Sequence, residues 1–211
     1  IWIGTVGALN RFDGKTVKHF TNIAGDTTSP YTSQPRTIHN DNKGRLWIGY
    51  ETGLTEFNFN NSTFRRIPLF KDLYIQKIVS YGDSVLYIAT NRGFIRYNIN
   101  TSEVFNYGLS SRLPHEVLKR NNVNDVIAIN DSLFMATNRG LVILSIKTNE
   151  STLVPVPVLN KTPIRTIAID KDRNIWLGTF GEVKLVKLSV DLKKTEVYDR
   201  FLSSSVNTQP M

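Results

Sequence analysis

The chain has 211 residues, of which 40% are hydrophobic and 10% aromatic, contains no cysteine, and has a formal net charge of +8 at pH 7. The lack of cysteine excludes disulfides and thiolate metal sites, and no apolar run approaches the ~20 residues of a membrane-spanning helix. A positive surface favours anionic partners. The basic residues are nevertheless scattered singly or in pairs, without a basic stripe and stacking aromatics, so we expect no nucleic-acid partner.

A five-residue motif with an aromatic residue at its second position occurs five times along the chain. Ile1-Trp2-Ile3-Gly4-Thr5, Leu46-Trp47-Ile48-Gly49-Tyr50 and Ile175-Trp176-Leu177-Gly178-Thr179 are near copies of one another, and two eroded copies between them have Tyr or Phe in place of Trp. The aromatic residues recur every 40–47 positions, at Trp2, Trp47, Tyr87, Phe134 and Trp176. A period of this length indicates a repeat fold.

Each complete period predicts four short strands in the same order. A β-branched segment comes first, and turn formers such as Asp41-Asn42-Lys43-Gly44 join it to the aromatic strand. A glycine then opens an alternating strand, and an Asn- or Thr-rich turn leads into a weaker fourth strand. Four antiparallel strands per period are typical of a propeller blade. The expected blades are residues 1–21 (partial), 36–69, 75–109, 123–156 and 164–201.

The first blade starts on its second strand, so the sequence predicts just under five blades. We expect these to be part of a larger ring, because an incomplete arc exposes the apolar faces of its end blades. The recurring aromatics, together with Gly49 and Gly178, are interpreted as packing positions between blades, since residues that repeat in register more often pack repeats together than bind ligands.

The residues resemble the two-component regulator propeller repeat. Asp41, Gly44, the Leu46–Gly49 phrase, Gly53-Leu54 and Phe57-Asn58 match its pattern nearly position for position, and the likeness extends over the whole chain. The resemblance implies a ring of about seven blades in the periplasmic sensor region of a membrane-anchored histidine kinase or hybrid two-component regulator. It further implies a small-molecule or oligosaccharide ligand, a homodimer in the full protein, and contacts with the remaining blades and a following domain.

The sequence offers no constellation for catalysis or metal binding. His19, His39 and His115 are the only histidines, and none has a metal-ligand partner at a useful spacing. No nucleophile elbow and no phosphate loop occur, because the glycines recur once per blade as turn residues. We therefore predict a non-enzyme that has no cofactor and no metal.

The candidate binding residues lie where the repeats differ, on the face where interblade connections and strand-two turns emerge. Two connections on this face are long, residues 22–35 with Tyr31 and residues 109–122 with His115. Arg36 and Arg165 begin inner strands, and with Arg92 and Arg139 we expect them to form a ring of guanidinium groups that captures carboxylate or sulfate. The predicted function is the sensing of an oligosaccharide. The arginines lead to the more specific hypothesis that this oligosaccharide is acidic.

Three alternatives stay open. Arg36 and Arg165 could instead brace neighbouring blades through backbone carbonyls. The propeller could serve as a protein-binding scaffold, which would show a large apolar patch on the loop face. A lyase on a propeller would need His, Tyr and Arg side chains to converge, and His115 and Tyr31 are the residues available for it.

Overall fold

A computed structural model of the chain describes residues 1–108, 116–119, 121–159, 162–180 and 185–198. In these residues, nineteen β-strands form five antiparallel sheets, one with three strands and four with four, and the strands of each sheet follow one another in sequence. This architecture confirms the predicted β-propeller with just under five blades. The last positions of the fifth expected blade, residues 199–201, lie outside the described residues.

The strands of the first three blades are short, with three to seven residues each. Blade 1 consists of β1 (Trp2–Gly4), β2 (Leu9–Phe12) and β3 (Val17–Phe20). Blade 2 consists of β4 (Pro35–Asn40), β5 (Leu46–Tyr50), β6 (Gly53–Asn58) and β7 (Thr63–Ile67). Blade 3 consists of β8 (Ile75–Tyr81), β9 (Val85–Thr90), β10 (Gly93–Asn98) and β11 (Val104–Asn106).

The last two blades repeat this order, and three short 3-10 helices lie between blades. Blade 4 consists of β12 (Val123–Ile129), β13 (Ser132–Thr137), β14 (Gly140–Ser145) and β15 (Ser151–Val154). Blade 5 consists of β16 (Ile164–Ile169), β17 (Ile175–Thr179), β18 (Leu185–Leu188) and β19 (Thr195–Tyr198). The 3-10 helices are η1 (Pro68–Phe70), η2 (Glu116–Leu118) and η3 (Pro157–Leu159).

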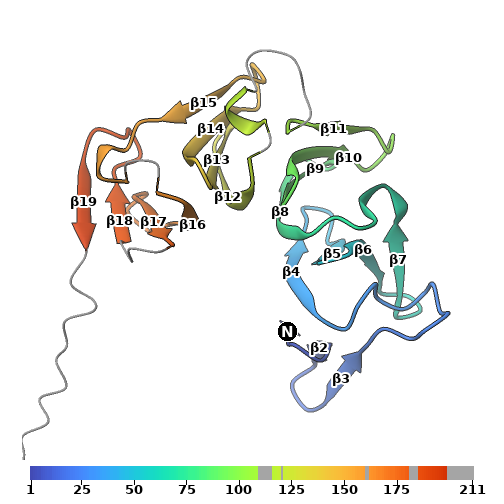
Figure 1. Cartoon of the computed structure of the whole chain (residues 1–211). Helices are drawn as coiled ribbons and strands as arrows, with labels where there is room; N and C mark the ends of the chain where they lie inside the picture. The colour runs from blue at the N-terminus through green and yellow to red at the C-terminus, as the bar shows by residue number, and fades with distance from the viewer. Residues whose placement is uncertain (109–115, 120, 160–161, 181–184, 199–211) are drawn as a thin grey trace, which may run out of the picture.

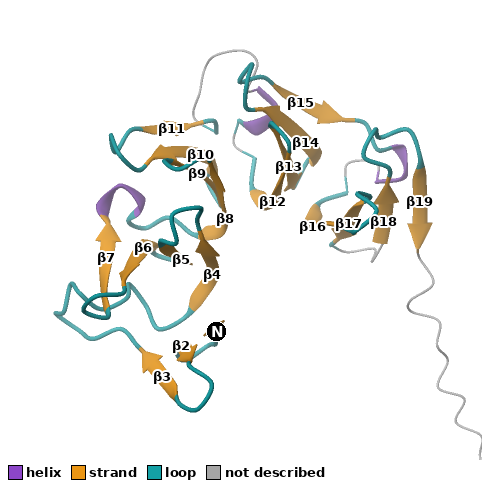
Figure 2. Cartoon of the chain, turned by 180° about the vertical axis from the view of Figure 1, so that it is seen from behind, coloured by secondary structure: helices purple, strands orange, loops and turns teal. Residues whose placement is uncertain are grey.

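The blades stand side by side in an open arc (Figures 1 and 2). The inner strands β4, β8, β12 and β16 border the concave side, and each contacts the inner strand of the next blade. The outer strands β7, β11, β15 and β19 lie on the convex side. All inner strands therefore run in the same direction, so equivalent residues of successive blades lie at the same height along the arc.

The repeated aromatic side chain packs onto the following blade. Trp47 is fully buried in a cluster with Ile75 and Ile78 of blade 3. In the same way, Tyr87 packs with Val123 of blade 4, and Phe134 packs with Ile164 of blade 5. Trp2 reaches blade 2, where its ring lies 4.8 Å from that of Phe57. Burying a large apolar side chain contributes about 1.5–3 kcal/mol to stability, so one aromatic residue per repeat stabilises the contact between each blade and the next.

The tiny residue two positions after the aromatic allows this close stacking. A Cβ added at Gly49 would lie 2.5 Å from Ile75 Cγ2 of the next inner strand and 2.6 Å from Thr37 Cγ2. The equivalent Gly178 would meet Thr166 Cγ2 at 2.8 Å. Blades 3 and 4 have alanine at this position, Ala89 and Ala136, and both are fully buried.

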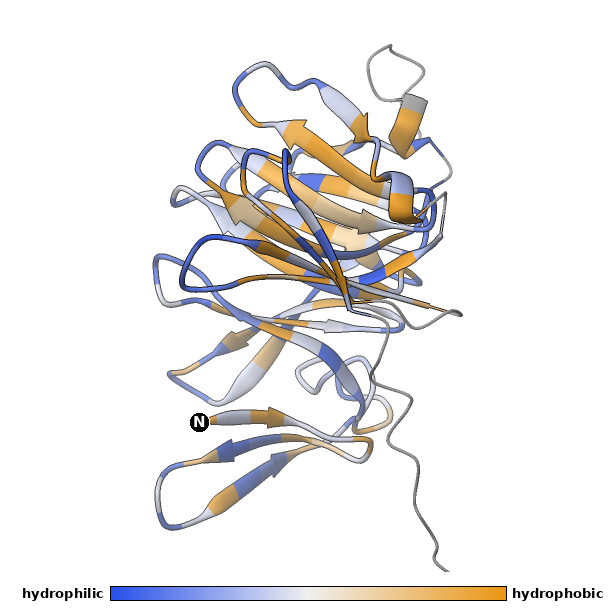
Figure 3. Ribbon diagram, turned by 90° about the vertical axis from the view of Figure 1, so that its left-hand side faces the viewer, coloured by the Kyte–Doolittle hydropathy of each residue, from blue (hydrophilic) through white to orange (hydrophobic). Residues whose placement is uncertain are grey.

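A short helix closes three of the interblade connections. Each 3-10 turn buries one apolar side chain between two blades, namely Phe70, Leu118 and Leu159. Figure 3 shows hydrophobic residues along the strands and hydrophilic residues in the turns, as expected for stacked sheets. These helices could not be predicted from the sequence, because a single turn has no hydrophobic periodicity.

The first and last blades of the arc differ in the exposure of their hydrophobic side chains. On blade 1, Ile1 and Ile3, which flank Trp2 in the sequence, are 78% and 49% exposed. On blade 5, Trp176 is half-buried against Tyr198, with the ring centroids 5.4 Å apart. No helix in the described part of the chain is long and apolar enough to span a membrane.

Candidate ligand-binding face

Strand direction separates two faces of the arc. The interblade connections and the turns between the second and third strands emerge on one face, here called the loop face. The hairpins between the first and second strands emerge on the opposite face, here called the hairpin face. The start of the inner strands β4, β8, β12 and β16 on the loop face is here called the mouth.

A β-bulge recurs at the mouth in all four complete blades. The register between first and second strands shifts between Pro35 and Thr37, and the same shift occurs at the equivalent place in blades 3, 4 and 5. A bulge leaves one residue unpaired and re-aims its side chain, and bulges are frequent next to functional sites. The bulged residues are Arg36, Gln76, Asn124 and Arg165.

Each bulged residue shares the mouth with the residue that follows the second strand of its own blade. We call these mouth pairs, and three of them are in contact. Arg36 hydrogen-bonds Glu51, Asn124 Nδ2 donates to Asn138 Oδ1 at 2.9 Å, and the Arg165 guanidinium lies 5.1 Å from the Phe180 ring centroid. Gln76 and Asn91 occupy the same positions in blade 3. The scaffold is thus constant while the mouth pairs vary.

The two mouth arginines have different electrostatic surroundings. Arg36 forms an ion pair with Glu51, which raises the pKa of the guanidinium, and it stacks 5.4 Å from the Tyr74 ring of the next interblade connection. Arg165 is exposed, and among the described residues it has no carboxylate partner. The charge of Arg36 is therefore balanced within the fold, whereas that of Arg165 is not balanced by any carboxylate in the described part of the chain.

The other two candidate arginines lie on turns rather than on inner strands. Arg92 and Arg139 are exposed between the second and third strands of blades 3 and 4. Arg139 borders a shallow cavity of about 200 Å³ whose walls include Leu153 and Leu159. The structure gives no contact between these two side chains and Arg36 or Arg165. They extend the positive charge of the loop face outward from the mouth.

The candidate aromatic Tyr31 is engaged in packing. Its ring is half-buried with the Arg66 guanidinium 5.1 Å above it, and it contacts Gly53 closely. Arg66 also holds the long first connection, because its nitrogens donate to the carbonyl oxygens of Asp26, Ser29 and Pro30 at 2.9–3.0 Å. His115 lies outside the described residues.

A polar row runs just inside the mouth across three blades. Asp125 Oδ2 accepts hydrogen bonds from Thr166 Oγ1 at 2.9 Å and from the Ile167 backbone N–H at 3.1 Å, both in blade 5. On its other side, Asp125 Oδ1 lies 3.5 Å from Lys77 Nζ of blade 3. Because the Asp125 side chain is only 13% exposed, this carboxylate ties blades 3, 4 and 5 together beneath the mouth.

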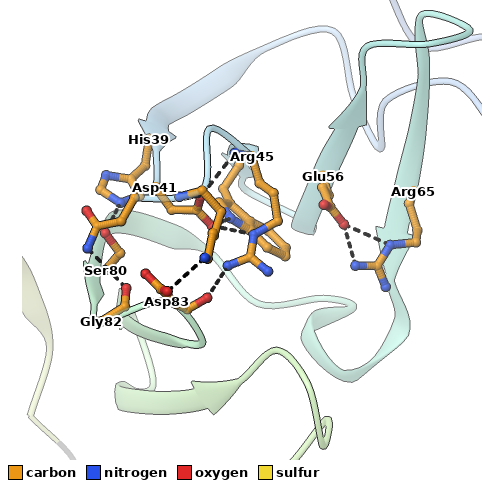
Figure 4. A network of polar contacts seen from close by, with 11 residues as sticks. His39, Asp41, Arg45, Glu56, Arg65, Ser80, Gly82 and Asp83 are labelled. Atoms are coloured by element: carbon orange, nitrogen blue, oxygen red, sulfur yellow. Dashed lines mark hydrogen bonds and ion pairs between the residues drawn. The ribbon is translucent and has the colours of Figure 1, made fainter.

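On the hairpin face, aspartate carboxylates accept the hydrogen bonds that hold the turns. Asp41 is buried, and its oxygens accept hydrogen bonds from the Trp47 indole at 2.9 Å, from Arg45 Nε at 2.6 Å and from the Lys43 and Arg45 backbone N–H groups (Figure 4). Burial would raise the pKa of Asp41, but these hydrogen bonds outweigh it and lower the pKa. Asp41 therefore has two roles: it stabilises the hairpin turn, as the sequence predicts, and it binds the indole of the repeated tryptophan.

Blade 5 repeats this arrangement. Asp170 accepts the Trp176 indole N–H at 2.8 Å, and this bond, with further help from Asn174, lowers the pKa of Asp170 to about 2. Blades 3 and 4 have Tyr87 and Phe134 at the tryptophan position and lack the indole donor. The aspartate six residues before Trp47 and before Trp176 is the sequence signal that would have predicted the bond.

Neighbouring hairpins are also joined to one another. Asn42 Nδ2 donates to Gly82 O at 3.1 Å, and Lys43 Nζ lies 2.9 Å from Asp83 Oδ2. Further along, Tyr81 Oη donates to Asp131 Oδ1 at 2.9 Å. His39 Nε2 lies 3.0 Å from Ser80 Oγ in the same region, and burial lowers the pKa of this imidazole. These hydrogen bonds and ion pairs join neighbouring blades on the hairpin face, whereas Arg92, Arg139 and Arg165 of the loop face have no carboxylate partner among the described residues.

Nothing in the described ranges assembles a metal centre, since no three His, Asp or Glu side chains come together there. Exposed arginines above a ring of strand starts can bind an anion by charge-assisted hydrogen bonds.

Comparisons with known proteins confirm the resemblance found in the sequence. A model described as two component regulator propeller matches residues 158–181, which include part of the connection between blades 4 and 5 and the first two strands of blade 5. A curated relative, histidine kinase P4 of Formosa agariphila, is 24% identical over 169 residues. That alignment covers 72% of this chain and 12% of the kinase.

Two solved structures show the same fold. The extracellular domain of a putative hybrid two-component system from B. thetaiotaomicron has a TM-score of 0.71 and 20% identity, covering 92% of this chain and 28% of that one. Virginiamycin B lyase from Staphylococcus aureus has a TM-score of 0.64 and 16% identity, covering 93% of this chain and 65% of the lyase. One of these proteins is an enzyme, so the fold alone does not decide between sensing and catalysis.

Proposed function

Because the chain carries a two-component regulator propeller repeat, we propose that it is part of the ligand-sensing, extracytoplasmic propeller of a two-component regulatory system. In this proposal it is not an enzyme, and it recognises an oligosaccharide on its loop face and passes the signal to a histidine kinase in the same polypeptide. Periplasmic location, membrane anchoring and a homodimer belong to the same proposal. The similarity to a histidine kinase and to an extracellular domain of a hybrid two-component system supports it.

The observation that carries the binding part is the contrast between the two faces. On the hairpin face the buried carboxylate of Asp41 and its neighbours satisfy one another. On the loop face Arg92, Arg139 and Arg165 are exposed and have no carboxylate partner in the described part of the chain. A ligand with carboxylate or sulfate groups would form charge-assisted hydrogen bonds with these guanidinium groups, which favours an acidic oligosaccharide.

Transmission of the signal requires that the ligand bind one state of the receptor better than the other. The blades are stacked through buried aromatics and bridged by Asp125, so a large deformation within the arc is unfavourable. We therefore place the two-state step between the propeller and other parts of the polypeptide or its dimer partner, with the ligand contacting both.

A thermal-shift screen tests this function. The natural polypeptide that contains residues 1–211 would be heated with acidic and neutral oligosaccharides at low and physiological salt. A ligand at one hundred times its dissociation constant should add about 2.7 kcal/mol to the free energy of unfolding and raise the midpoint. A shift confined to acidic sugars, and weakened by salt, is the expected result. No shift with any sugar would contradict the proposal and favour a protein-binding scaffold.

A further inference from the structure

The mouth pairs combine a fixed geometry with variable chemistry. The same bulge in four consecutive blades holds the same backbone position toward the concave side, yet the side chains form an ion pair, an amide pair and a cation–aromatic pair. In repeat proteins, positions that vary on a constant scaffold form the binding surface. Packing alone would not require the pairs to differ, because the blades around them stack in the same way.

Two of the pairs have their polar groups already occupied. Glu51 binds the Arg36 guanidinium, so a ligand carboxylate would have to displace a carboxylate that is already in place. Asn124 Nδ2 donates both to Asn138 Oδ1 and to the carbonyl oxygen of Ile164 at 2.7 Å, and the residue is only 9% exposed. The Asn124 pair joins blades 4 and 5 through the Ile164 carbonyl. Arg36 instead binds a carboxylate of its own blade, and not the neighbouring backbone carbonyls that the bracing alternative supposed.

The pair in blade 5 is different. Phe180 is 66% exposed and lies against the Arg165 guanidinium, so a cation–π contact holds one face of the guanidinium. No acceptor among the described residues occupies its N–H edge. Guanidinium binds carboxylate through that edge, with two parallel hydrogen bonds. The exposed phenyl ring beside it offers the apolar surface on which a sugar ring can lie.

We propose that Arg165 and Phe180 form the subsite that reads the acidic sugar unit of the ligand, and that Arg36 is kept out of this role by Glu51. This inference rests on the proposed function and names the residue that supplies its charge selectivity. The ligand chemistry is a hexuronate or a similarly acidic sugar ring. The carboxylate pairs with Arg165, and the ring packs on Phe180.

Arginine-selective labelling with phenylglyoxal, read by peptide mass spectrometry on the natural polypeptide, gives a rate for each arginine. The probe ligand is sodium glucuronate, with glucose as the neutral control and ionic strength held constant. We expect Arg165 to react quickly and to be protected several-fold by glucuronate but not by glucose. Arg36 should react slowly with or without the sugar. Arg173, exposed on the hairpin face, is the internal control and should show no protection.

Two variants sharpen the test. Glu51→Gln should release Arg36, so that Arg36 reacts faster and becomes protected by glucuronate. Phe180→Ala should weaken glucuronate protection of Arg165 without changing the reactivity of Arg173. Unchanged labelling of Arg165 in saturating glucuronate would overturn the inference, and so would equal protection of Arg36 and Arg165 in the parent protein.

The outcomes also separate the inference from the proposed function. If acidic oligosaccharides stabilise the polypeptide and Arg165→Gln binds them as tightly as the parent, the sensor stands and the subsite is wrong. If glucuronate protects Arg165 but no oligosaccharide stabilises the protein, the subsite stands and the sensor proposal fails.

Discussion

The bond between Asp41 and Trp47 allows the stability of the repeat to be tested in isolation. Trp47→Phe keeps an aromatic ring at a fully buried position but removes the indole N–H that Asp41 Oδ2 accepts at 2.9 Å. Losing a hydrogen bond to a charged, buried group costs about 1.5–3 kcal/mol, and the smaller ring adds a packing defect. We therefore expect Trp47→Phe to lower the free energy of unfolding by about 2–4 kcal/mol.

Trp2→Phe is the matched control for this change. Trp2 occupies the equivalent position in blade 1 but is only half-buried, and among the described residues its indole nitrogen has no hydrogen-bond partner. The same chemical substitution should cost less than about 1 kcal/mol there. Urea unfolding followed by far-ultraviolet circular dichroism is the appropriate assay, because tryptophan fluorescence changes with the substitutions themselves.

A double-mutant cycle isolates the bond from the change in ring size. Combining Trp47→Phe with Asp41→Ala should reveal a coupling energy of about 1.5–3 kcal/mol, because the indole bond is lost only once. If the two substitutions are additive within about 0.5 kcal/mol, or if Trp47→Phe is no more harmful than Trp2→Phe, the bond contributes nothing and the reasoning is refuted.

Three further substitutions test the interblade contacts. Asp125→Ala removes the acceptor for Thr166 Oγ1 and the Ile167 N–H and should cost about 2–3 kcal/mol in urea unfolding; a loss below ~0.5 kcal/mol would exclude a bridging role. Gly49→Ala places a Cβ 2.5 Å from Ile75 Cγ2 and should cost about 1–3 kcal/mol, whereas Gly7→Ala, with nothing within 4 Å, should be neutral; equal effects would contradict the stacking account. The lowered pKa of His39, caused mainly by burial, means that the unfolded chain binds a proton more readily than the native one, so stability should fall as pH drops below the ordinary value of 6.5. His39→Gln should flatten that part of the stability profile, and an unchanged slope would show that His39 is not responsible.

The repeat pattern was sufficient to predict the blades because packing dictates it. Each blade needs an aromatic residue that packs on the next blade and, two positions later, a small residue that lets the next inner strand approach, as Gly49 does for Ile75. The same short motif therefore recurs in each repeat. The aspartate of the hairpin was also visible in the sequence, but its bond to Trp47 requires a three-dimensional fold that brings the two side chains together.

The candidate site was predicted only in outline. The sequence placed Arg36 and Arg165 at the start of inner strands but gave no sign of the bulge that turns their side chains toward the mouth. It also treated the two arginines as equivalent, because the ion pair of Arg36 with Glu51 joins residues 15 positions apart. The packing of Tyr31 beneath Arg66 depends on a contact across 35 residues and was likewise invisible.

The central claim is that the loop face, and not the hairpin face, binds an acidic ligand. Calorimetric titration with the best acidic oligosaccharide from the screen would compare the parent with two charge-matched variants. The loop-face variant is Arg139→Gln/Arg165→Gln, and the hairpin-face variant is Lys15→Gln/Lys171→Gln, in the turns between β2 and β3 and between β16 and β17. We expect the loop-face variant to lose at least about tenfold in affinity, or ~1.4 kcal/mol, and the hairpin-face variant to match the parent. Equal affinities of the parent and the loop-face variant, or an equal loss in both variants, would contradict the account.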